Sequence, residues 1–360
     1  MNSTYFFLKK LNLLSINGHS FVKGLNNGSA LSAIYYNGEE KIVVKFLINP
    51  RNKVELERFR LEYSVLSCNY HNSAWTSQGY KHKSDFFNYD YERHEDGITD
   101  PLPKIRVPIF HSQDNHINYF GYKYEEGILL SDYDSSKLSL DDKLLLITRI
   151  ASALNYFNRC GYVHRDLHPG NILLMDDPRM YDDPPQPRVM ILDLGNCQRN
   201  TEHHYEKMTF RLDRDLDEEL VFNDNNKRLL SSFTSMPPDF LTHGENTKNY
   251  DAWAIGIYSY ELIFGHKPFL INDIKDVYKI KAIPFLPTYV MNNLYTLKKG
   301  IRLVFQSLLN SDGNKRPGTD AIVRLFNFIL DDDDFCDDKD GYAQRIIKDN
   351  GFDLEARHDY

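Results

Sequence analysis

Residues 164–171 read HRDLHPGN and place Asp166 five residues before Asn171. A carboxylate that can orient a hydroxyl, followed at that spacing by a side-chain carbonyl that can bind Mg²⁺, is what transfer of a γ-phosphate requires. Residues 139–162 carry apolar side chains at helical spacing, and residues 172–174 are short and apolar enough for a strand. A helix, a polar loop and a strand in this order would hold the two polar side chains rigidly.

This octet resembles the HRDLKPxN catalytic loop of the eukaryotic-type protein kinase family, with His168 where Ser/Thr kinases carry lysine. Histidine can donate a hydrogen bond, but it is only partly charged near neutral pH. Loops of the form HGDLHPGN occur in small-molecule kinases of the aminoglycoside-phosphotransferase type. The octet alone therefore leaves both families open.

Three later motifs favour the protein kinases, because the small-molecule kinases lack this set. They are PPD at 237–239, which resembles A-P-E, DAWAIG at 251–256, which matches D-x-W-x-x-G, and KRP at 315–317. The resemblance implies that Asp239 and Arg316 form a buried pair, since each charged group in the interior needs a partner. It extends from residue 24 to residue 330, broken by loops.

The resemblance implies an α+β, bilobal protein-kinase-like fold, with a small β-rich N-lobe carrying one regulatory helix and a larger, mainly helical C-lobe. The sequence pattern agrees with this architecture. Strand-like runs at 31–36 and 41–47 flank Asn37-Gly38, a strong hairpin signal, and a helical pattern follows at 52–68. Further strands are predicted at 104–111 and 117–124, and further helices at 250–264, 302–309 and 319–330.

The predicted boundaries follow from the same comparison. They are 1–15 for an N-terminal extension, 16–124 for the N-lobe, 125–330 for the C-lobe and 331–360 for an acidic C-terminal tail. Within the lobes we expect an inserted loop at 69–103, an insertion at 175–188 and an activation segment at 193–239.

Lys45 lies in a predicted strand, in the run IVVK, and resembles the lysine of the family's VAIK motif. The resemblance implies that Lys45 neutralises the α- and β-phosphates of ATP. A lysine buried beside phosphates needs a carboxylate to orient it, and the following helix offers Glu55, Glu57 and Glu62. We favour Glu62, because the leucine and histidine of the family's E-x-x-x-L…H pattern follow it.

The Gly-rich loop of the family has only a weak counterpart. Residues 26–33 (NNGSALSA) can be laid on G-x-G-x-x-G-x-V with Gly28 as the matching glycine, while Gly24 permits another register. Backbone amides of such a loop cradle phosphate oxygens. We assign that contact to Gly28, Ser29 and Ala30.

The adenine-binding hinge is predicted near residues 119–127, which resemble the strand leading into it. The resemblance implies a gatekeeper residue at Tyr122. It also implies that Lys123, Tyr124 and Glu125 form the hinge that contacts the nucleotide.

Asp193 begins DLG after a predicted strand and resembles the family's DFG motif with leucine for phenylalanine. The resemblance implies that Asp193 and Asn171 ligate Mg²⁺, or Mn²⁺ in its place. It assigns Asp166 to the acceptor hydroxyl, with His168 as a further catalytic residue. Arg165 makes the loop one of the RD type, which implies that it pairs with a phosphate on the activation segment. Candidate hydroxyls are those of Thr201, Thr209, Ser231, Ser232, Thr234 and Ser235.

Composition sets broader limits. The 360 residues carry a net charge of −8, which argues against a general nucleic-acid binder. Aspartates in 331–338 supply much of it, which favours a solvated tail. The four cysteines are scattered and form no C-x-x-C pair, which argues against a metal site or a disulfide framework. We therefore expect a reducing compartment. With no signal peptide or membrane-spanning run, we expect a cytoplasmic enzyme, although a non-classical secretion route leaves no such trace.

Together these features predict an ATP- and Mg²⁺-dependent kinase that phosphorylates Ser or Thr hydroxyls of protein substrates, and also itself. HRDLHPGN lacks the AAR-type sequence of tyrosine kinases, which disfavours tyrosine specificity. Two alternatives stay open. One is a small-molecule kinase, favoured by His168 and the weak Gly-rich loop, and the other is a pseudokinase that binds nucleotide without catalysis. The pattern indicates neither the natural substrate nor the oligomeric state.

Overall fold

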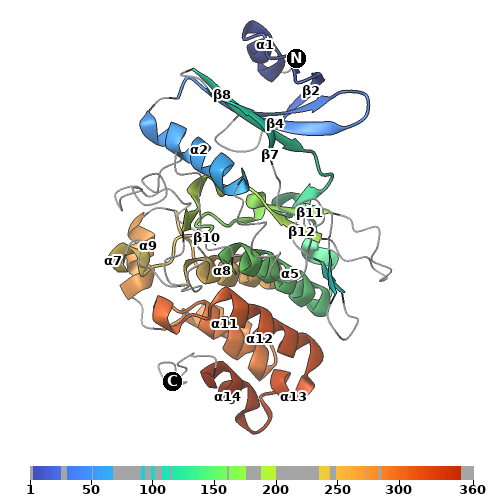
Figure 1. The fold of residues 1–360 in the computed structure, drawn as a ribbon. Helices are drawn as coiled ribbons and strands as arrows, with labels where there is room; N and C mark the ends of the chain where they lie inside the picture. The colour runs from blue at the N-terminus through green and yellow to red at the C-terminus, as the bar shows by residue number, and fades with distance from the viewer. Residues whose placement is uncertain are drawn as a thin grey trace, which may run out of the picture.

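The computed structural model has two lobes, a small one built on a β-sheet and a larger helical one, as the sequence predicts (Figure 1). Helix α1 (Ser3–Lys10) lies at the far end of the small lobe, and α14 (Tyr342–Asp349) lies at the opposite end of the molecule. The structure describes residues 3–25, 31–50, 52–67, 91–93, 99–101, 108–113, 116–159, 162–175, 188–199, 235–243, 249–272, 274–282 and 285–349.

A six-stranded antiparallel sheet forms the N-lobe. β-Branched and aromatic residues fill its central strands, because such side chains pack well on a pleated surface. The predicted hairpin joins β3 to β4: Tyr36 lies opposite Lys41, and Gly38 adopts a φ of +102°, which glycine does without strain. In spatial order the strands are β1 (Ser15–Ile16), β2 (His19–Leu25), β3 (Leu31–Tyr36), β4 (Lys41–Ile48), β8 (Ile117–Lys123) and β7 (Pro108–Ser112).

Both faces of this sheet are covered. Helix α2 (Lys53–Ser67) packs on the inner face, where the rings of Phe59 and Phe120 have centroids 5.0 Å apart. Helix α1 (Ser3–Lys10) lies against β2 on the outer face, and its Leu8 is completely buried. The predicted N-terminal extension therefore contributes to the packing of the N-lobe.

The two predicted insertions are described only in part. Within residues 69–103, β5 (Tyr91–Arg93) and β6 (Thr99–Pro101) pair as a short antiparallel hairpin, so the prediction of a loop is wrong at these positions. The rest of 69–103 lies outside the described residues, as do residues 176–187 of the second insertion.

Helix α8 (Tyr250–Phe264) is central to the C-lobe and has the predicted limits. It is apolar on nearly all sides because neighbouring helices pack around it; Trp253 is completely buried and stacks on Phe269. No helix of the described residues is both long and apolar enough to cross a membrane. The other helices here are α5 (Leu140–Arg159), α7 (Phe240–His243), α9 (Ile274–Ala282), α10 (Thr288–Leu294), α11 (Lys299–Leu308) and α12 (Thr319–Asp331).

Short strands hold the HRDLHPGN loop at both ends. β11 (Ile172–Met175) follows the loop and lies between β9 (Ile128–Leu129) and β12 (Arg188–Ile191). β10 (Tyr162–Val163) precedes the loop and pairs with β13 (Gln198–Arg199). The loop is therefore fixed by backbone pairing on each side, which is what rigid placement of its polar side chains needs.

The C-terminal segment corrects one prediction. Residues 331–349 are not a solvated tail, because they fold onto the C-lobe as α13 (Asp333–Cys336) and α14 (Tyr342–Asp349). Part of their acidic charge is paired: Nζ of Lys298 lies 2.7 Å from a carboxylate oxygen of Asp333. Residues 350–360 lie outside the described residues.

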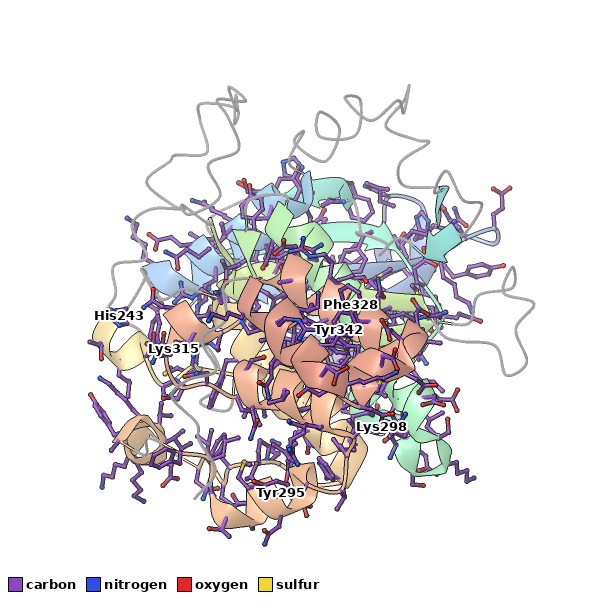
Figure 2. All side chains as sticks on the ribbon, turned by 90° about the horizontal axis from the view of Figure 1, so that it is seen from below. His243, Tyr295, Lys298, Lys315, Phe328 and Tyr342 are labelled. Carbon is purple, nitrogen blue, oxygen red and sulfur yellow. The ribbon has the colours of Figure 1, made fainter. Side chains whose placement is uncertain are left out.

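Apolar side chains within the acidic run explain why this segment docks. Phe335, Ala343 and Ile347 are completely buried in the C-lobe core. Figure 2 shows Phe328 and Tyr342 together on this face, and their rings meet edge to face. Removal of this apolar surface from water stabilises the docked segment. Asp331, Asp333, Asp334 and Asp337 stay exposed, while the buried Asp338 pairs with Nζ of Lys299 at 3.1 Å.

Candidate active site

A cavity of about 890 Å³ lies between the lobes and contains most of the residues predicted for the site. Its volume is in the range of pockets that bind small ligands. The predicted residues on its wall are Lys45, Glu62, Tyr122, Tyr124, Glu125, Asp166, His168, Asn171 and Asp193. The fold thus brings together residues from both lobes that lie far apart in the sequence.

Lys45 contacts two carboxylates in this cleft. Its Nζ lies 2.5 Å from Oε2 of Glu62, the predicted partner, and 3.1 Å from Oδ1 of Asp193. Burial alone would lower the pKa of the Lys45 ammonium, but the two carboxylates outweigh burial and raise this pKa. Lys45 therefore keeps a positive charge on the wall of the cleft.

Helix α2 presents Glu62 to Lys45 through its apolar face. Phe59 and Leu66 are buried three residues before and four residues after Glu62, so the three side chains share one side of the helix. Burial raises the pKa of the Glu62 carboxyl, and Lys45 opposes this effect. Glu57, one of the alternatives, instead pairs with Lys53 at 3.2 Å.

Asp193 is held by an unusual backbone conformation. It follows β12 with φ 58° and ψ 77°, a left-handed geometry that costs energy for residues other than glycine. Burial would raise the pKa of its carboxyl, but the Lys45 ammonium prevails and lowers it. The next residue, Leu194, is buried in the same apolar cluster as Phe59 of α2. This packing ties the turn to the N-lobe helix.

The catalytic loop closes on itself through Asn171. Its Nδ2 donates to the backbone oxygen of Asp166 at 2.9 Å, and a 3₁₀ turn, η3 (Pro169–Asn171), precedes β11. These contacts set the two side chains at fixed positions on the same wall of the cleft. The structure therefore places Asp166 and Asn171 together in the cleft, as their spacing in the sequence suggested.

Asp251 supports the loop in a way that the sequence analysis did not predict. Its carboxylate accepts the backbone N–H groups of His164 at 2.8 Å and of Arg165 at 2.9 Å. Arg165 has a φ of 66°, so these bonds help to hold a strained backbone. The available signal was an acidic residue in a nearly all-apolar helix, because a buried carboxylate must find donors.

His168 lies with its ring beside Gly170. Its Nδ1 accepts the N–H of Gly170 at 3.1 Å, and a Cβ at position 170 would lie 3.0 Å from Cε1 of the ring. A ring nitrogen that accepts carries no proton, so the proton of the neutral ring is on Nε2. Burial lowers the pKa of the His168 imidazole, which favours this neutral form. His168 is thus a neutral hydrogen-bond donor rather than a replacement for the lysine charge.

The predicted hinge follows β8. Tyr122, Tyr124 and Glu125 line the cavity, whereas Lys123 is exposed and is not among the lining residues. Just beyond, a Cβ on Gly127 would lie 2.4 Å from a backbone oxygen of β11, so only glycine allows this close approach.

The predicted phosphate loop, Gly28, Ser29 and Ala30, lies outside the described residues. Leu25 and Leu31, which are described on either side, line the cavity. Gly24, the alternative start of the loop, lies within β2 instead. A Cβ there would be 2.6 Å from a side chain of α1, so close packing accounts for this glycine.

Arg165, expected to pair with a phosphate, is buried with its guanidinium facing the rings of Phe240 and Tyr250. It also donates to Oε1 of Gln198 at 2.9 Å. Among the candidate hydroxyls, Ser235 alone falls within the described residues. It is completely buried and donates to a backbone carbonyl of the catalytic loop at 2.6 Å, so in this arrangement its hydroxyl has a structural role.

Comparison with known sequences decides the family. A sequence model of the protein kinase domain matches residues 109–326, more than half of the chain. The chain belongs to the protein kinase family. Serine/threonine-protein kinase Sgk1 of Bos taurus is 27% identical over 186 residues, which are 50% of this chain and 35% of that protein. The 3-phosphoinositide-dependent protein kinase 1 of Rattus norvegicus is 28% identical over 166 residues, 44% of this chain and 24% of that protein.

A solved kinase structure shares the fold. The crystal structure of Rad53 1-466 in complex with AMP-PNP matches with a TM-score of 0.54 and 18% sequence identity, covering 91% of this chain and 69% of that one. At this identity the match shows the fold alone. It includes the N-lobe, most of which precedes the residues matched by the family model. The chain spans about a third or less of the curated relatives described above.

The kinase domain contains the pair predicted between Asp239 and Arg316. A guanidinium nitrogen of Arg316 lies 2.6 Å from Oδ1 of Asp239, which confirms this contact. Nη1 of Arg316 donates to the backbone oxygen of Asn310 at 2.8 Å, and Oδ2 of Asp239 accepts the N–H of Gly313 at 2.9 Å. Each charge therefore has both an opposite charge and a backbone partner.

Asn171 and Asp193 are the residues of this kinase domain that could hold a divalent cation. They supply an amide oxygen and a carboxylate to the same cleft. No group of three or more His, Cys, Asp or Glu side chains forms a metal cluster in the described parts of the chain. Mg²⁺ commonly takes one or two protein ligands and completes its octahedron with phosphate oxygens and water. The donor set therefore fits Mg²⁺ that arrives with a nucleotide.

Proposed function

We propose that this kinase domain is catalytically active and transfers the γ-phosphate of ATP to Ser or Thr hydroxyls of proteins, its own included. The observation that carries the proposal is that one cleft gathers Lys45, Asp166, Asn171 and Asp193. Phosphoryl transfer needs a cation for the phosphates, oxygen ligands for the metal ion and a carboxylate for the acceptor. These four residues supply all three.

In this proposal, residues on the N-lobe side of the cleft bind the phosphates. Lys45 binds oxygens of the α- and β-phosphates, and Glu62 holds its ammonium in place. Bound Mg²⁺, or Mn²⁺ in its place, would neutralise phosphate charge at Asn171 and Asp193. The adenine lies beside the hinge, where Tyr122 and the residues after it line the cavity.

Residues of the catalytic loop act on the acceptor hydroxyl and on the transferred phosphoryl group. Asp166 orients the hydroxyl and accepts its proton as the phosphoryl group leaves ATP. His168 donates its Nε2–H to an oxygen of the transferred group. No covalent enzyme intermediate is required, because fixed charges and correct positioning lower the barrier.

A protein acceptor is supported by two features. The Asp239–Arg316 pair, together with the D-x-W-x-x-G helix, belongs to the set of motifs that favoured protein kinases over small-molecule kinases. The relatives named above are described as a serine/threonine-protein kinase and as a protein kinase. Ser and Thr are therefore the proposed acceptors.

The test uses purified full-length chain, radiolabelled ATP, Mg²⁺ and a generic protein acceptor. Wild type should label the acceptor and itself, with label on phosphoserine or phosphothreonine after acid hydrolysis. Asp166→Ala should lower transfer by a factor of about 100 or more, since it removes the proton acceptor. Asp334→Ala is the matched control, because this exposed carboxylate lies on α13, away from the cleft, and its loss should leave transfer unchanged.

Other outcomes would redirect the proposal. His168 favours the small-molecule alternative, which gains support if label enters aminoglycosides or other small hydroxyl compounds and no protein. Nucleotide binding without any transfer would identify a pseudokinase. Label on phosphotyrosine would contradict the proposed specificity while keeping the enzyme class.

A further inference from the structure

Asn196, the residue after the DLG motif, contacts the proposed catalytic carboxylate directly. Its Nδ2 donates to Oδ2 of Asp166 at 2.7 Å, and both residues line the cleft. The bond joins a neutral amide to a carboxylate, and such charge-assisted bonds are short and roughly twice as strong as neutral ones. Neither the catalytic-loop motif nor DLG includes this residue.

The fold explains why Asn196 reaches Asp166. Gln198 lies opposite Val163 in the β10–β13 ladder, so the chain entering β13 runs beside the chain leaving β10. Asn196 ends the 3₁₀ turn η4 (Leu194–Asn196) just before this ladder, and Asp166 follows just after it. The backbone pairing therefore sets the amide against the carboxylate.

A second amide side chain of this segment also contacts the catalytic loop. Two residues beyond Asn196, Oε1 of Gln198 accepts a bond from Nη1 of Arg165 at 2.9 Å. The segment from Asn196 to Gln198 thus contacts two successive residues of the catalytic loop. Only the Asn196 bond involves a group assigned to the chemistry.

We propose that Asn196 is a positioning residue that fixes the carboxylate of Asp166 for the acceptor hydroxyl, an inference that rests on the function proposed above. The amide holds Oδ2 and so orients the carboxylate that receives the hydroxyl proton. Asn171 holds the backbone of the same residue by donating to its oxygen. One amide therefore fixes the backbone of Asp166, and the other fixes its carboxylate.

The bond also links acceptor orientation to the proposed metal ligand. Asp193 is the residue that leads into η4, and Asn196 is the last residue of that turn. A turn this short moves as a unit, because its backbone is closed by the bond from Cys197 N–H to the Leu194 oxygen at 3.1 Å. Placement of Asp193 and of the Asp166 carboxylate therefore depends on the same turn.

Asn196→Leu keeps the size of the side chain and removes the donor. We expect kcat to fall about 10-fold to 100-fold, as loss of a bond to a charged group implies, while affinity for an ATP analogue changes less than about twofold. Asn196→Gln, which retains the amide, should recover part of the lost kcat.

Asn196→Asp is an independent test, because aspartate has nearly the same shape as asparagine. It replaces the donor by a second carboxylate, which repels the Asp166 carboxylate instead of holding it. We expect kcat to fall at least as far as in the leucine variant, while affinity for an ATP analogue again changes less than about twofold. This variant keeps the proposal testable if the leucine variant fails to fold.

Asn249→Leu is the control for a purely structural defect. Its amide donates to two backbone oxygens of the C-lobe, at 3.1 Å to Gly313 and 2.8 Å to Arg316. This variant should lower Tm without lowering the kcat of the folded protein. Asn196 variants with the wild-type kcat would overturn the inference, and so would a fall in kcat that follows Tm alone. Wild-type protein without transfer would instead refute the proposed function.

Discussion

Two buried ion pairs, one in each lobe, differ in what surrounds them. Arg316 of the C-lobe is 1% exposed, and its guanidinium donates to Asp239 and to the backbone oxygens of Asn310 and Asn249. Lys45 of the N-lobe keeps 12% of its side chain exposed on the wall of the cleft. Its described partners are the side chains of two carboxylates.

The difference shows how one kind of interaction serves stability in one place and chemistry in another. Backbone partners cannot move without unfolding the C-lobe, so the Arg316 pair locks two segments together. The partners of Lys45 sit on α2 and on the DLG turn, which are separate elements. Under the proposed function, Lys45 therefore exchanges a carboxylate for a phosphate without loss of the fold.

The largest expected effect is on the C-lobe pair. Arg316→Ala leaves Asp239 buried without its opposite charge, which should cost about 3–5 kcal/mol in the free energy of unfolding. Urea denaturation followed by far-UV circular dichroism measures this cost. The matched control is Arg324→Ala, whose pair with Asp320 is exposed and should contribute less than about 1 kcal/mol. A cost for Arg316→Ala as small as that of the control would break the comparison.

Lys45→Met should separate activity from stability. We expect phosphate transfer to fall by a factor of about 100 or more, because the phosphates lose their cation. The free energy of unfolding should fall by only about 1–2 kcal/mol, since the Glu62 carboxyl, whose pKa burial already raises, can take up a proton. Transfer assays and urea denaturation measure the two quantities on the same preparation.

Lys53→Met controls for loss of a lysine charge from the N-lobe, because Lys53 is largely exposed at the start of α2. It should leave both quantities near their wild-type values. If Lys45→Met unfolds the protein as readily as Arg316→Ala does, the two pairs have the same role and the comparison is wrong.

The smallest expected effect concerns the pH dependence of the cleft pair. Lys45 lowers the pKa of Asp193, so the ionised carboxylate stabilises the fold above its unfolded-state pKa of about 3.9, and this contribution is lost as pH falls through the lower folded value. Asp193→Asn should therefore reduce Tm by a constant amount from about pH 5 to pH 8, with a difference that shrinks below about pH 4.

The corresponding difference in the free energy of unfolding is less than about 1 kcal/mol, because part of the Asp193 side chain faces solvent. Thermal denaturation of both proteins across this pH range measures it. A difference that changes between pH 5 and pH 8 would show that another group, such as His168, controls the charge of the pair.

Local sequence patterns were sufficient to predict those features of the structure that depend on neighbouring residues. The hairpin at Asn37-Gly38, the limits of α8 and the turn that sets Asn171 beside Asp166 all depend on short stretches of chain. The Asp239–Arg316 contact was also predictable, since motifs mark both residues and burial demands a partner. In the first three cases one physical requirement of a short segment admits few solutions, and in the fourth the motifs identify the distant partner.

Patterns failed where two signals compete or where the partner is remote. The aspartates of the C-terminal segment suggested a solvated tail, yet Phe335 and Ile347 are completely buried beside them, because apolar burial outweighs a charge run that can stay at the surface. The contacts of Asn196 and Gln198 with the catalytic loop depend on strand pairing that no motif records.

The residues alone therefore specify that this chain is built to handle a nucleotide phosphate, because lysine, aspartate and asparagine at these spacings carry the required charges and oxygens. Tertiary packing decides the rest: it brings the favoured Glu62 to Lys45 and buries the Asp239–Arg316 pair, and it alone shows that the Asn196 amide holds Asp166. The reason is that such contacts depend on distances between residues remote in sequence, and those distances exist only once the hydrophobic cores have formed.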